Sequence, residues 1–221
     1  MIPAFSLERT QELIYDLNNL IDRKHLLPRI PIYLDSPLAI KAIAVYRKYS
    51  HYYDEEAKRF FNSGDDLFQF PGLVLAETAT ESKLINRARN PKIIIAGSGM
   101  MNGGRIMHHA ARYLANSRNT LLIIGYQAHG TLGRQILEGA PAVSIMNQHI
   151  PVRCQVKAVG ALSAHGDQEK LFNWLTSSPV LPKQVCLNHG EPAASEALKI
   201  KLTKSANLAT TVAFPNLSLD I

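Results

Sequence analysis

Short runs of apolar residues alternate with longer segments of helical periodicity along most of this chain. The runs predict strands at residues 32–34, 73–76, 93–96, 121–124 and 142–145. The segments between them repeat apolar residues every three or four positions, which is typical of amphipathic helices. Strands that alternate with helices over such short distances indicate βαβ units. The sequence therefore predicts an α/β fold built on a largely parallel βαβ sheet.

Some of the predicted helices begin at residues that suit a helix start. Ser36 follows a predicted strand, and its hydroxyl is a good N-cap acceptor. Pro37 comes next, at the first helical position, where its missing N–H costs nothing. Further helices are expected at residues 10–21, 54–61, 80–89, from about 105, and at 131–137. The chain opens almost at once on a short strand at residues 2–5, so we expect a further segment before it in the complete protein.

The C-terminal part of the chain differs in its pattern. A longer strand with partial alternation is expected at residues 154–160, followed by a helix at 167–175 that carries the single tryptophan, Trp174. A strand at 185–187, a helix after Pro192 and a strand at 209–214 follow. We therefore expect two domains, residues 1–160 and residues 161–221.

Charge and cysteine content narrow the class of protein. The chain has 24 Lys and Arg against 18 Asp and Glu, a net charge of +6. A basic balance suits a polyanionic partner such as nucleic acid, although many unrelated proteins are equally basic. Cys154 and Cys186 each lie in an apolar run, and we expect reduced core thiols rather than a disulfide.

Neither a membrane span nor a signal peptide is expected. The longest purely apolar stretches are far below the roughly 18 residues that a membrane span needs. The N-terminus lacks the basic flank and apolar core of a signal peptide. The expected location is therefore the cytoplasm, with no membrane partner.

The most informative segment joins the predicted strand 93–96 to the helix that follows. Its loop is rich in glycine, with Gly97, Gly99, Gly103 and Gly104. Glycines let backbone N–H groups approach an anion closely, and a helix N-terminus adds partial positive charge. The helix then presents a polar stripe at positions i, i+3, i+4 and i+7, made of Arg105, His108, His109 and Arg112. The segment is either a phosphate site or a plain turn followed by a solvated helix face.

A dinucleotide site is the less favoured alternative for this loop. The G-x-G-x-x-G fingerprint needs its third glycine one residue earlier than Gly103. The acidic residue expected about 20 positions further on is also missing.

Two histidines follow predicted strands at strand-to-helix turns, where sites in α/β proteins usually form. His165 and His189 are each followed by glycine and then an acidic residue, Asp167 and Glu191. This repetition favours function over a structural role. A triad of Ser163, His165 and Asp167 is not favoured, because such close neighbours seldom meet as a triad. No H-x-H-x-D-H, H-E-x-x-H or C-x-x-C pattern supplies a complete metal site.

Six motifs occur in a fixed order: Met1-Ile-Pro-Ala-Phe-Ser-Leu-Glu-Arg-Thr-Gln-Glu-Leu, Tyr33-Leu-Asp-Ser-Pro-Leu-Ala, Gly97-Ser-Gly-Met-Met-Asn-Gly-Gly-Arg, Gly125-Tyr-Gln-Ala-His-Gly-Thr-Leu-Gly, Ser163-Ala-His-Gly-Asp and Asn188-His-Gly-Glu. Each is weak alone, but together they are specific and span nearly the whole chain. In this order they resemble the β-CASP metallo-β-lactamases, which include bacterial and archaeal RNA-processing nucleases and the polyadenylation endonuclease subunit.

The resemblance implies a particular domain arrangement. In that family a metallo-β-lactamase domain carries an H-x-H-x-D-H zinc motif early in the chain, a β-CASP domain is inserted, and the chain then returns to complete the first domain. Residues 1–160 are accordingly expected to form most of a β-CASP cap. Residues 161–221 are expected to form an incomplete metallo-β-lactamase αβ tail, and the half with the zinc motif is missing.

The resemblance also implies roles for individual residues. His165 matches the histidine beside the scissile phosphate, a proton donor to the leaving oxygen, and His189 matches the late zinc ligand. The loop and helix residues that match the RNA-backbone contacts are Ser98, Gly99, Arg105 and His108. Glu8 departs from the pattern, because members often carry glycine there, and this affects the expected local turn rather than the family.

Two functions remain open from the sequence. The first is the cap and C-terminal catalytic segment of a zinc-dependent ribonuclease that hydrolyses single-stranded RNA. The second is a non-catalytic RNA-binding or regulatory module derived from such a nuclease. Because only His189 of the implied zinc ligands is present, we expect no stoichiometric zinc on this chain. Its partner would be the missing N-terminal half or a second copy in a homodimer.

Overall fold

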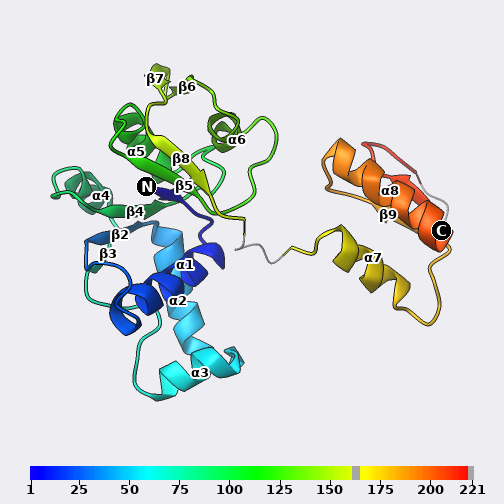
Figure 1. Cartoon of the computed structure of the whole chain (residues 1–221), viewed down its shortest axis with the longest axis horizontal. Helices are drawn as coiled ribbons and strands as arrows, with labels where there is room; N and C mark the ends of the chain where they lie inside the picture. The colour runs from blue at the N-terminus through cyan, green and yellow to red at the C-terminus, as the bar shows by residue number, and fades with distance from the viewer. Residues whose placement is uncertain (161–164, 219–221) are drawn as a thin grey trace. The chain divides into compact units, whose positions relative to one another are not determined.

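A computed structural model describes residues 1–160 and 165–218 of the chain (Figure 1). The chain divides into two compact units, Met1–Ser163 and Ala164–Ile221, and each is described by itself. The expected domain boundary at residue 160 falls beside the residues 161–164 that lie outside the description. No helix among the described residues is long and apolar enough to cross a membrane.

A four-stranded parallel sheet forms the centre of the first unit. Its strands are β1 (Ile2–Pro3), β2 (Ile32–Asp35), β3 (Leu73–Leu75) and β4 (Ile93–Ala96), in the order β1-β4-β2-β3. Every pairing in this sheet is parallel. Ala96, the last residue of β4, pairs with Pro3 on one side and Asp35 on the other. Strands β1, β2 and β4 therefore end together at one edge of the sheet, which we call the carboxyl edge.

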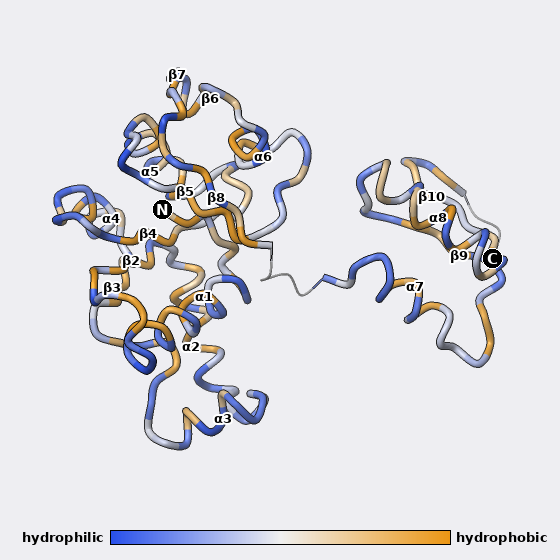
Figure 2. Tube along the Cα trace, in the orientation of Figure 1, coloured by the Kyte–Doolittle hydropathy of each residue, from blue (hydrophilic) through white to orange (hydrophobic). Residues whose placement is uncertain are grey.

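Helices cover both faces of this sheet. They are α1 (Arg9–Asn18) with its extension η1 (Asn19–Arg23), α2 (Pro37–Lys48), α4 (Ala79–Ile85) and α5 (Arg105–Tyr113). The short η2 (Ser50–Tyr52) and α3 (Glu55–Asn62) follow α2, and neither has a fully buried residue. Successive residues of β4 divide between the two faces: Ile95 packs in the cluster that includes α1 and α2, and Ile94 packs against Ile85 of α4. Figure 2 shows the hydrophobic residues gathered along the strands. A strand buried on both faces explains why residues 93–96 are all apolar.

The helix starts follow the local sequence. Ser36 Oγ accepts a hydrogen bond from the backbone N–H of Ala39, as expected for an N-cap in front of Pro37. Thr78 and Glu81 form a reciprocal capping box at the start of α4.

Four further strands belong to the first unit. Strands β5 (Thr120–Ile123) and β8 (Gln155–Ala158) pair in parallel. Strand β6 (Ala142–Ile145), which follows helix α6 (Leu132–Leu137), pairs antiparallel with β7 (Gln148–Pro151). The prediction of a largely parallel α/β sheet is confirmed, and β7 was not predicted. Its two-residue turn, Met146-Asn147, has positive φ at both residues but lacks the Asn-Gly or Asp-Gly sequence that usually identifies such a hairpin.

The second unit is small. It contains α7 (Gln168–Thr176), β9 (Gln184–Leu187), α8 (Pro192–Ala206) and β10 (Ala209–Val212), and the two strands pair in parallel. Its core consists of Val185, Leu202 and Leu208 with partly buried neighbours. Both cysteines are free thiols, and Cys154 is buried. The expectation that Cys186 is a core thiol was wrong, because Cys186 is exposed on β9.

Glu8 occupies a backbone conformation that favours glycine. Its φ is 68° and its ψ is −67°, and the N–H of Arg9 donates to the carbonyl of Leu7 at 2.9 Å, which closes a γ-turn just before α1. The Cβ of any L-residue is crowded at such a φ. The departure from glycine noted in the sequence thus falls on a strained turn.

Replacing Glu8 with glycine should stabilise the first unit by about 1 kcal/mol, because glycine removes the Cβ penalty and the Glu8–Arg9 ion pair is dispensable beside the closer Arg9–Glu12 pair. Urea unfolding at pH 7 measures the change. Glu8→Ala is the matched control, since it removes the carboxylate but keeps the Cβ. If alanine stabilises as much as glycine, the effect comes from charge and not from the backbone.

Candidate functional site

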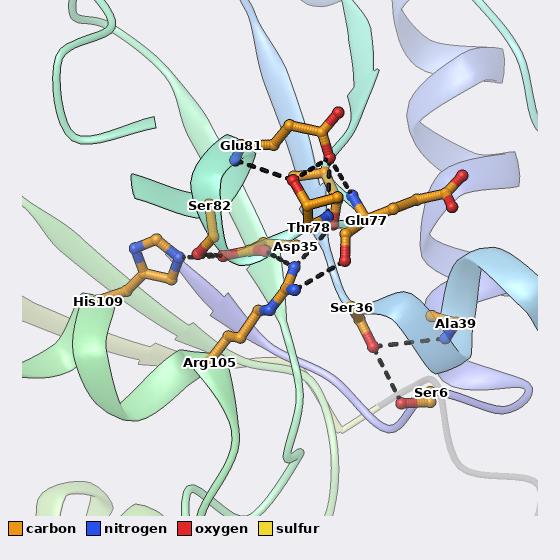
Figure 3. Close-up of polar contacts among 11 residues, drawn as sticks. Ser6, Asp35, Ser36, Ala39, Glu77, Thr78, Glu81, Ser82, Arg105 and His109 are labelled. Carbon is orange, nitrogen blue, oxygen red and sulfur yellow. Dashed lines mark hydrogen bonds and ion pairs between the residues drawn. The ribbon is translucent and has the colours of Figure 1, made fainter. Parts of the chain in front are cut away.

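Asp35 lies at the carboxyl edge and is fully buried. Three side chains donate hydrogen bonds to its carboxylate: Ser82 Oγ at 2.6 Å, Arg105 Nη1 at 2.6 Å and His109 Nε2 at 2.7 Å (Figure 3). Ser82 comes from α4 and the other two from α5. We call this group the Asp35 cluster. It ties both helices to the end of β2.

The cluster keeps Asp35 ionised. Burial raises the pKa of the Asp35 carboxyl, but hydrogen bonds from His109, Ser82 and Arg105 act the other way and together outweigh it. The net result is a pKa below the usual value for aspartate. Three hydrogen-bond donors thus compensate the charge of the buried carboxylate, and this ionised group joins β2 to α4 and α5.

Arg105 makes further hydrogen bonds besides the one to Asp35. Its Nη1 also donates to the carbonyl of Ala76 at 2.8 Å, and its Nη2 donates to the carbonyl of Glu77 at 2.8 Å. The side chain is 22% exposed. Arg105 therefore fixes the chain after β3, and its predicted contact to an RNA backbone stays a prediction.

The predicted polar stripe on α5 is only partly exposed. His109 is 2% exposed and points to Asp35, so its expected place on a solvated or phosphate-binding stripe was wrong. The reason is the buried carboxylate on β2, which a helix taken alone does not show. His108 and Arg112, on the same stripe, are exposed. Of the stripe, these two remain fully available to a ligand.

Hydrogen bonds within the glycine-rich loop between β4 and α5 hold its conformation. Ser98 Oγ donates to the carbonyl of Gly103 at 3.2 Å and accepts from the N–H of Asn102 at 3.1 Å. The N–H of Ile106 donates to the carbonyl of Gly97 at 3.0 Å. Gly104 has a φ of 77°, and a Cβ there would lie 2.4 Å from the Gly97 oxygen. Only glycine fits that position.

Gly99 lies under an aromatic ring. A Cβ on it would approach the ring of Phe5 to 2.7 Å, and the residue is buried. Ser98 and Gly99, the predicted backbone contacts, thus shape the loop, and their binding of RNA stays a prediction. The hydroxyls of Ser6 and Ser36 lie 3.1 Å apart beside this loop, so the segments after β1, β2 and β4 meet at the carboxyl edge. That edge is where ligands of parallel α/β sheets usually bind.

Sequence reasoning missed Asp35 and Gln127 as parts of this site. Gln127 is 3% exposed, and its Nε2 donates to the carbonyls of Gly99 at 2.9 Å and Gly125 at 3.1 Å. Both residues stood inside the ordered motifs Tyr33-Leu-Asp and Gly125-Tyr-Gln. An acid or amide at the end of an apolar strand was the available signal.

The two motif histidines lie in the second unit. His165 is exposed and precedes α7. Asp167 caps that helix, its Oδ1 accepting from the N–H of Lys170 at 2.8 Å, while Ser163 lies outside the described residues. His189 follows β9 with a φ of 66°, and it lines a cavity of about 720 Å³ within this unit together with Trp174.

The described residues do not form a zinc site. Within residues 1–160 and 165–218 no group of three His, Cys, Asp or Glu side chains could hold a metal ion. A catalytic zinc takes three protein ligands and a water. These residues alone therefore do not fit a resident zinc ion.

Two family models match the chain. The Beta-Casp domain model matches residues 10–136, and the model of the Zn-dependent metallo-hydrolase RNA specificity domain matches residues 149–213. The fold, the glycine loop and the two matches define a β-CASP protein of the metallo-β-lactamase fold. The chain belongs to the β-CASP family, and the resemblance seen in its motifs is confirmed.

Its curated relatives are longer proteins. "Ribonuclease TTHA0252" of Thermus thermophilus is 41% identical over 86% of this chain and 43% of its own length. "RNase J-like protein" of Methanocaldococcus jannaschii is 34% identical over 96% of this chain and 48% of its own length. "Transcription termination factor FttA" of Methanosarcina mazei is 29% identical over 95% of this chain and 34% of its own length. The chain spans less than half of the length of each of these relatives.

Replacing Asp35 with asparagine should destabilise the first unit by about 3–5 kcal/mol at pH 7, because it leaves the Arg105 charge without its carboxylate and sets amide donors against donors. Ser82→Ala, which removes one neutral donor, should cost only about 1 kcal/mol. Urea unfolding compares the two variants. Equal losses would show that the charge of Asp35 is not what holds the cluster.

The Asp35 carboxylate should also make the free energy of unfolding depend on pH in the acid range. Its pKa is lower in the folded state than in the unfolded chain, where aspartate titrates at about 3.9. The stabilisation is therefore complete above that value and is lost as the pH falls through the folded pKa. Below about pH 4 the wild type should lose stability more steeply than Asp35→Asn. Parallel curves of unfolding free energy against pH would contradict this.

Proposed function

We propose that this chain is the RNA-binding cap and C-terminal catalytic segment of a zinc-dependent ribonuclease that hydrolyses the RNA phosphodiester backbone. The observation that supports this most is that a Beta-Casp match is followed along the chain by an RNA specificity domain match. His165 and His189 lie within the second match. Two relatives with ribonuclease names support the same activity. The complete protein would need the half that this chain lacks.

We assign a separate role to each of the two domains. Residues 1–160 would bind the RNA backbone through Ser98, Gly99, Arg105 and His108 at the carboxyl edge. Residues 161–221 would supply His165 as the proton donor to the leaving oxygen and His189 as a late metal ligand. The Asp35 cluster supports this proposal because it anchors α5, and a glycine loop that leads into an anchored helix is a preorganised surface for a phosphate.

His165 should affect turnover more than binding in a protein that contains the upstream half. A proton donor lowers the barrier for departure of the leaving oxygen, so His165→Ala should reduce kcat by roughly 10²–10⁴-fold with little change in RNA affinity. Single-turnover cleavage and filter binding measure the two quantities. His129→Ala, a motif histidine of the first unit, is the control. Unchanged turnover of His165→Ala would remove this residue from the mechanism.

The chain on its own should hold no stoichiometric zinc and cleave no RNA. One imidazole does not bind zinc tightly, because affinity depends on several ligands in a fixed geometry. Metal analysis of untagged, dialysed protein and a ribonuclease assay with added zinc test this. One zinc per chain, or cleavage that His189→Ala abolishes, would mean that the chain is a nuclease by itself. A zinc site shared through His189 across a homodimer would appear as half-stoichiometric metal together with a dimeric mass.

A non-catalytic RNA-binding module is the second candidate. The observation that favours it is the lack of a three-ligand metal group in the described residues. The two candidates differ in one result: cleavage by a protein that joins this chain to its upstream half supports the nuclease, whereas RNA binding without cleavage supports the module.

A further inference from the structure

The positive charge of this chain is concentrated in one segment. Residues 82–137 contain eight of the 24 Lys and Arg residues and none of the 18 Asp and Glu residues. This segment includes most of α4, all of β4, α5 and β5, and the loops between them. The rest of the chain carries more acidic than basic residues, so the whole excess of positive charge belongs to this segment.

Three of these eight cations are committed to the fold. Arg105 binds Asp35, Arg134 pairs with Glu138, and Lys92 Nζ donates to the carbonyls of Ile85 and Ala88 at 2.7 and 2.9 Å. The other five are exposed and make no ion pair within the described part of the chain: Lys83, Arg87, Arg89, Arg112 and Arg118. Exposed cations without acidic neighbours are free to bind an anionic partner.

Tyr113 brings several of these cations to one place. Its hydroxyl donates to Asn86 Oδ1 at 3.2 Å, which sets the end of α4 beside the end of α5. Arg112 Cζ lies 5.9 Å from the centre of the Tyr113 ring, and Lys92 Nζ lies 5.5 Å from it. Lys92, Tyr113 and Arg118 also line one cavity of about 610 Å³, whose lining residues include no acid. Arg87 follows Asn86 directly, and Arg89 comes two residues later. We call the four exposed cations Arg87, Arg89, Arg112 and Arg118 the Tyr113 surface.

This surface lies at the opposite edge of the sheet from the Asp35 cluster. Lys92 immediately precedes β4, and Arg118 stands two residues before β5, so both mark the amino ends of parallel strands. Helix α5 begins at the glycine loop and ends at Tyr113 (Figure 1). Its nine residues span about 13 Å. Along the way His108 and Arg112 are exposed, so cationic or polar side chains continue from one edge to the other.

We propose that the Tyr113 surface is a second phosphate-binding surface for single-stranded RNA, which holds the strand after it has passed the glycine loop along α5. The proposal rests on the proposed function for the identity of the partner. Guanidinium groups suit phosphate oxygens, and several contacts to phosphates hold an RNA backbone without selecting a base. The surface therefore contributes affinity that does not depend on RNA sequence.

The test uses the full chain and a fluorescent single-stranded RNA of about 15 nucleotides, a length matched to large single-strand sites. Anisotropy gives the affinity between about 50 and 200 mM salt. The variant is Arg87→Gln with Arg112→Gln and Arg118→Gln. The control removes the same charge elsewhere, with Lys24→Gln, Lys48→Gln and Arg59→Gln, all exposed residues of the first unit. Urea unfolding midpoints equal to that of the wild type verify both folds.

Each phosphate contact to a single strand contributes about 0.7 to the slope of log affinity against log salt. The three substitutions in the Tyr113 surface should therefore lower that slope by about 2 and weaken binding on the order of 10–100-fold, for every RNA sequence alike. The control should stay close to the wild type. This pattern supports the proposal.

Three results would overturn it, and they differ in what else they affect. If the wild type binds RNA but the variant and the control lose the same affinity, the surface is not a binding site and the proposed function stands. If the wild type binds no RNA at low salt, both fail. If polyglutamate competes as well as RNA of equal charge, the surface takes an acidic protein segment instead.

Discussion

Asp35 places a negative charge inside the protein where the central sheet ends, and the surrounding chain is arranged to compensate it. One oxygen accepts from Arg105, and the other accepts from Ser82 and His109. An uncompensated buried charge costs several kcal/mol, so α4 and α5 cannot shift without losing these bonds. The glycine loop that joins β4 to α5 takes its position from the same restraint. The shape of the carboxyl edge thus depends on one carboxylate.

Because of the charge pattern of the chain, Arg105 depends on a carboxylate that is distant in the sequence. The acid-free segment 82–137 cannot neutralise its own partly buried Arg105, because it contains no carboxylate. Asp35 supplies it from a distance of 70 residues along the chain. Elsewhere on the segment the cations stay exposed around Tyr113. One segment therefore provides a neutralised interior contact at the carboxyl edge and an unneutralised surface at the amino edge.

Local sequence predicted the elements better than the contacts between them. The strand at residues 93–96 and the N-cap of Ser36 were evident from apolar runs and capping chemistry. Strand β7 was missed because its turn, Met146-Asn147, carries no glycine. His109 was expected to be exposed because helical spacing shows which residues share a side but not that a buried acid lies opposite one of them. The motif order identified the family, and the burial of one residue of the stripe became evident only from the structure.

The two-stranded sheet of the second unit has an evolutionary consequence. Strands β9 and β10 pair only with each other among the described residues, so each has one edge without a partner. Two strands form a stable sheet only when helices pack against them, and open edges invite pairing with other strands. A segment of this kind is poorly suited to domain shuffling, since a new host would have to provide the strands that complete it. We therefore expect residues 164–221 to be inherited together with the remainder of their own fold.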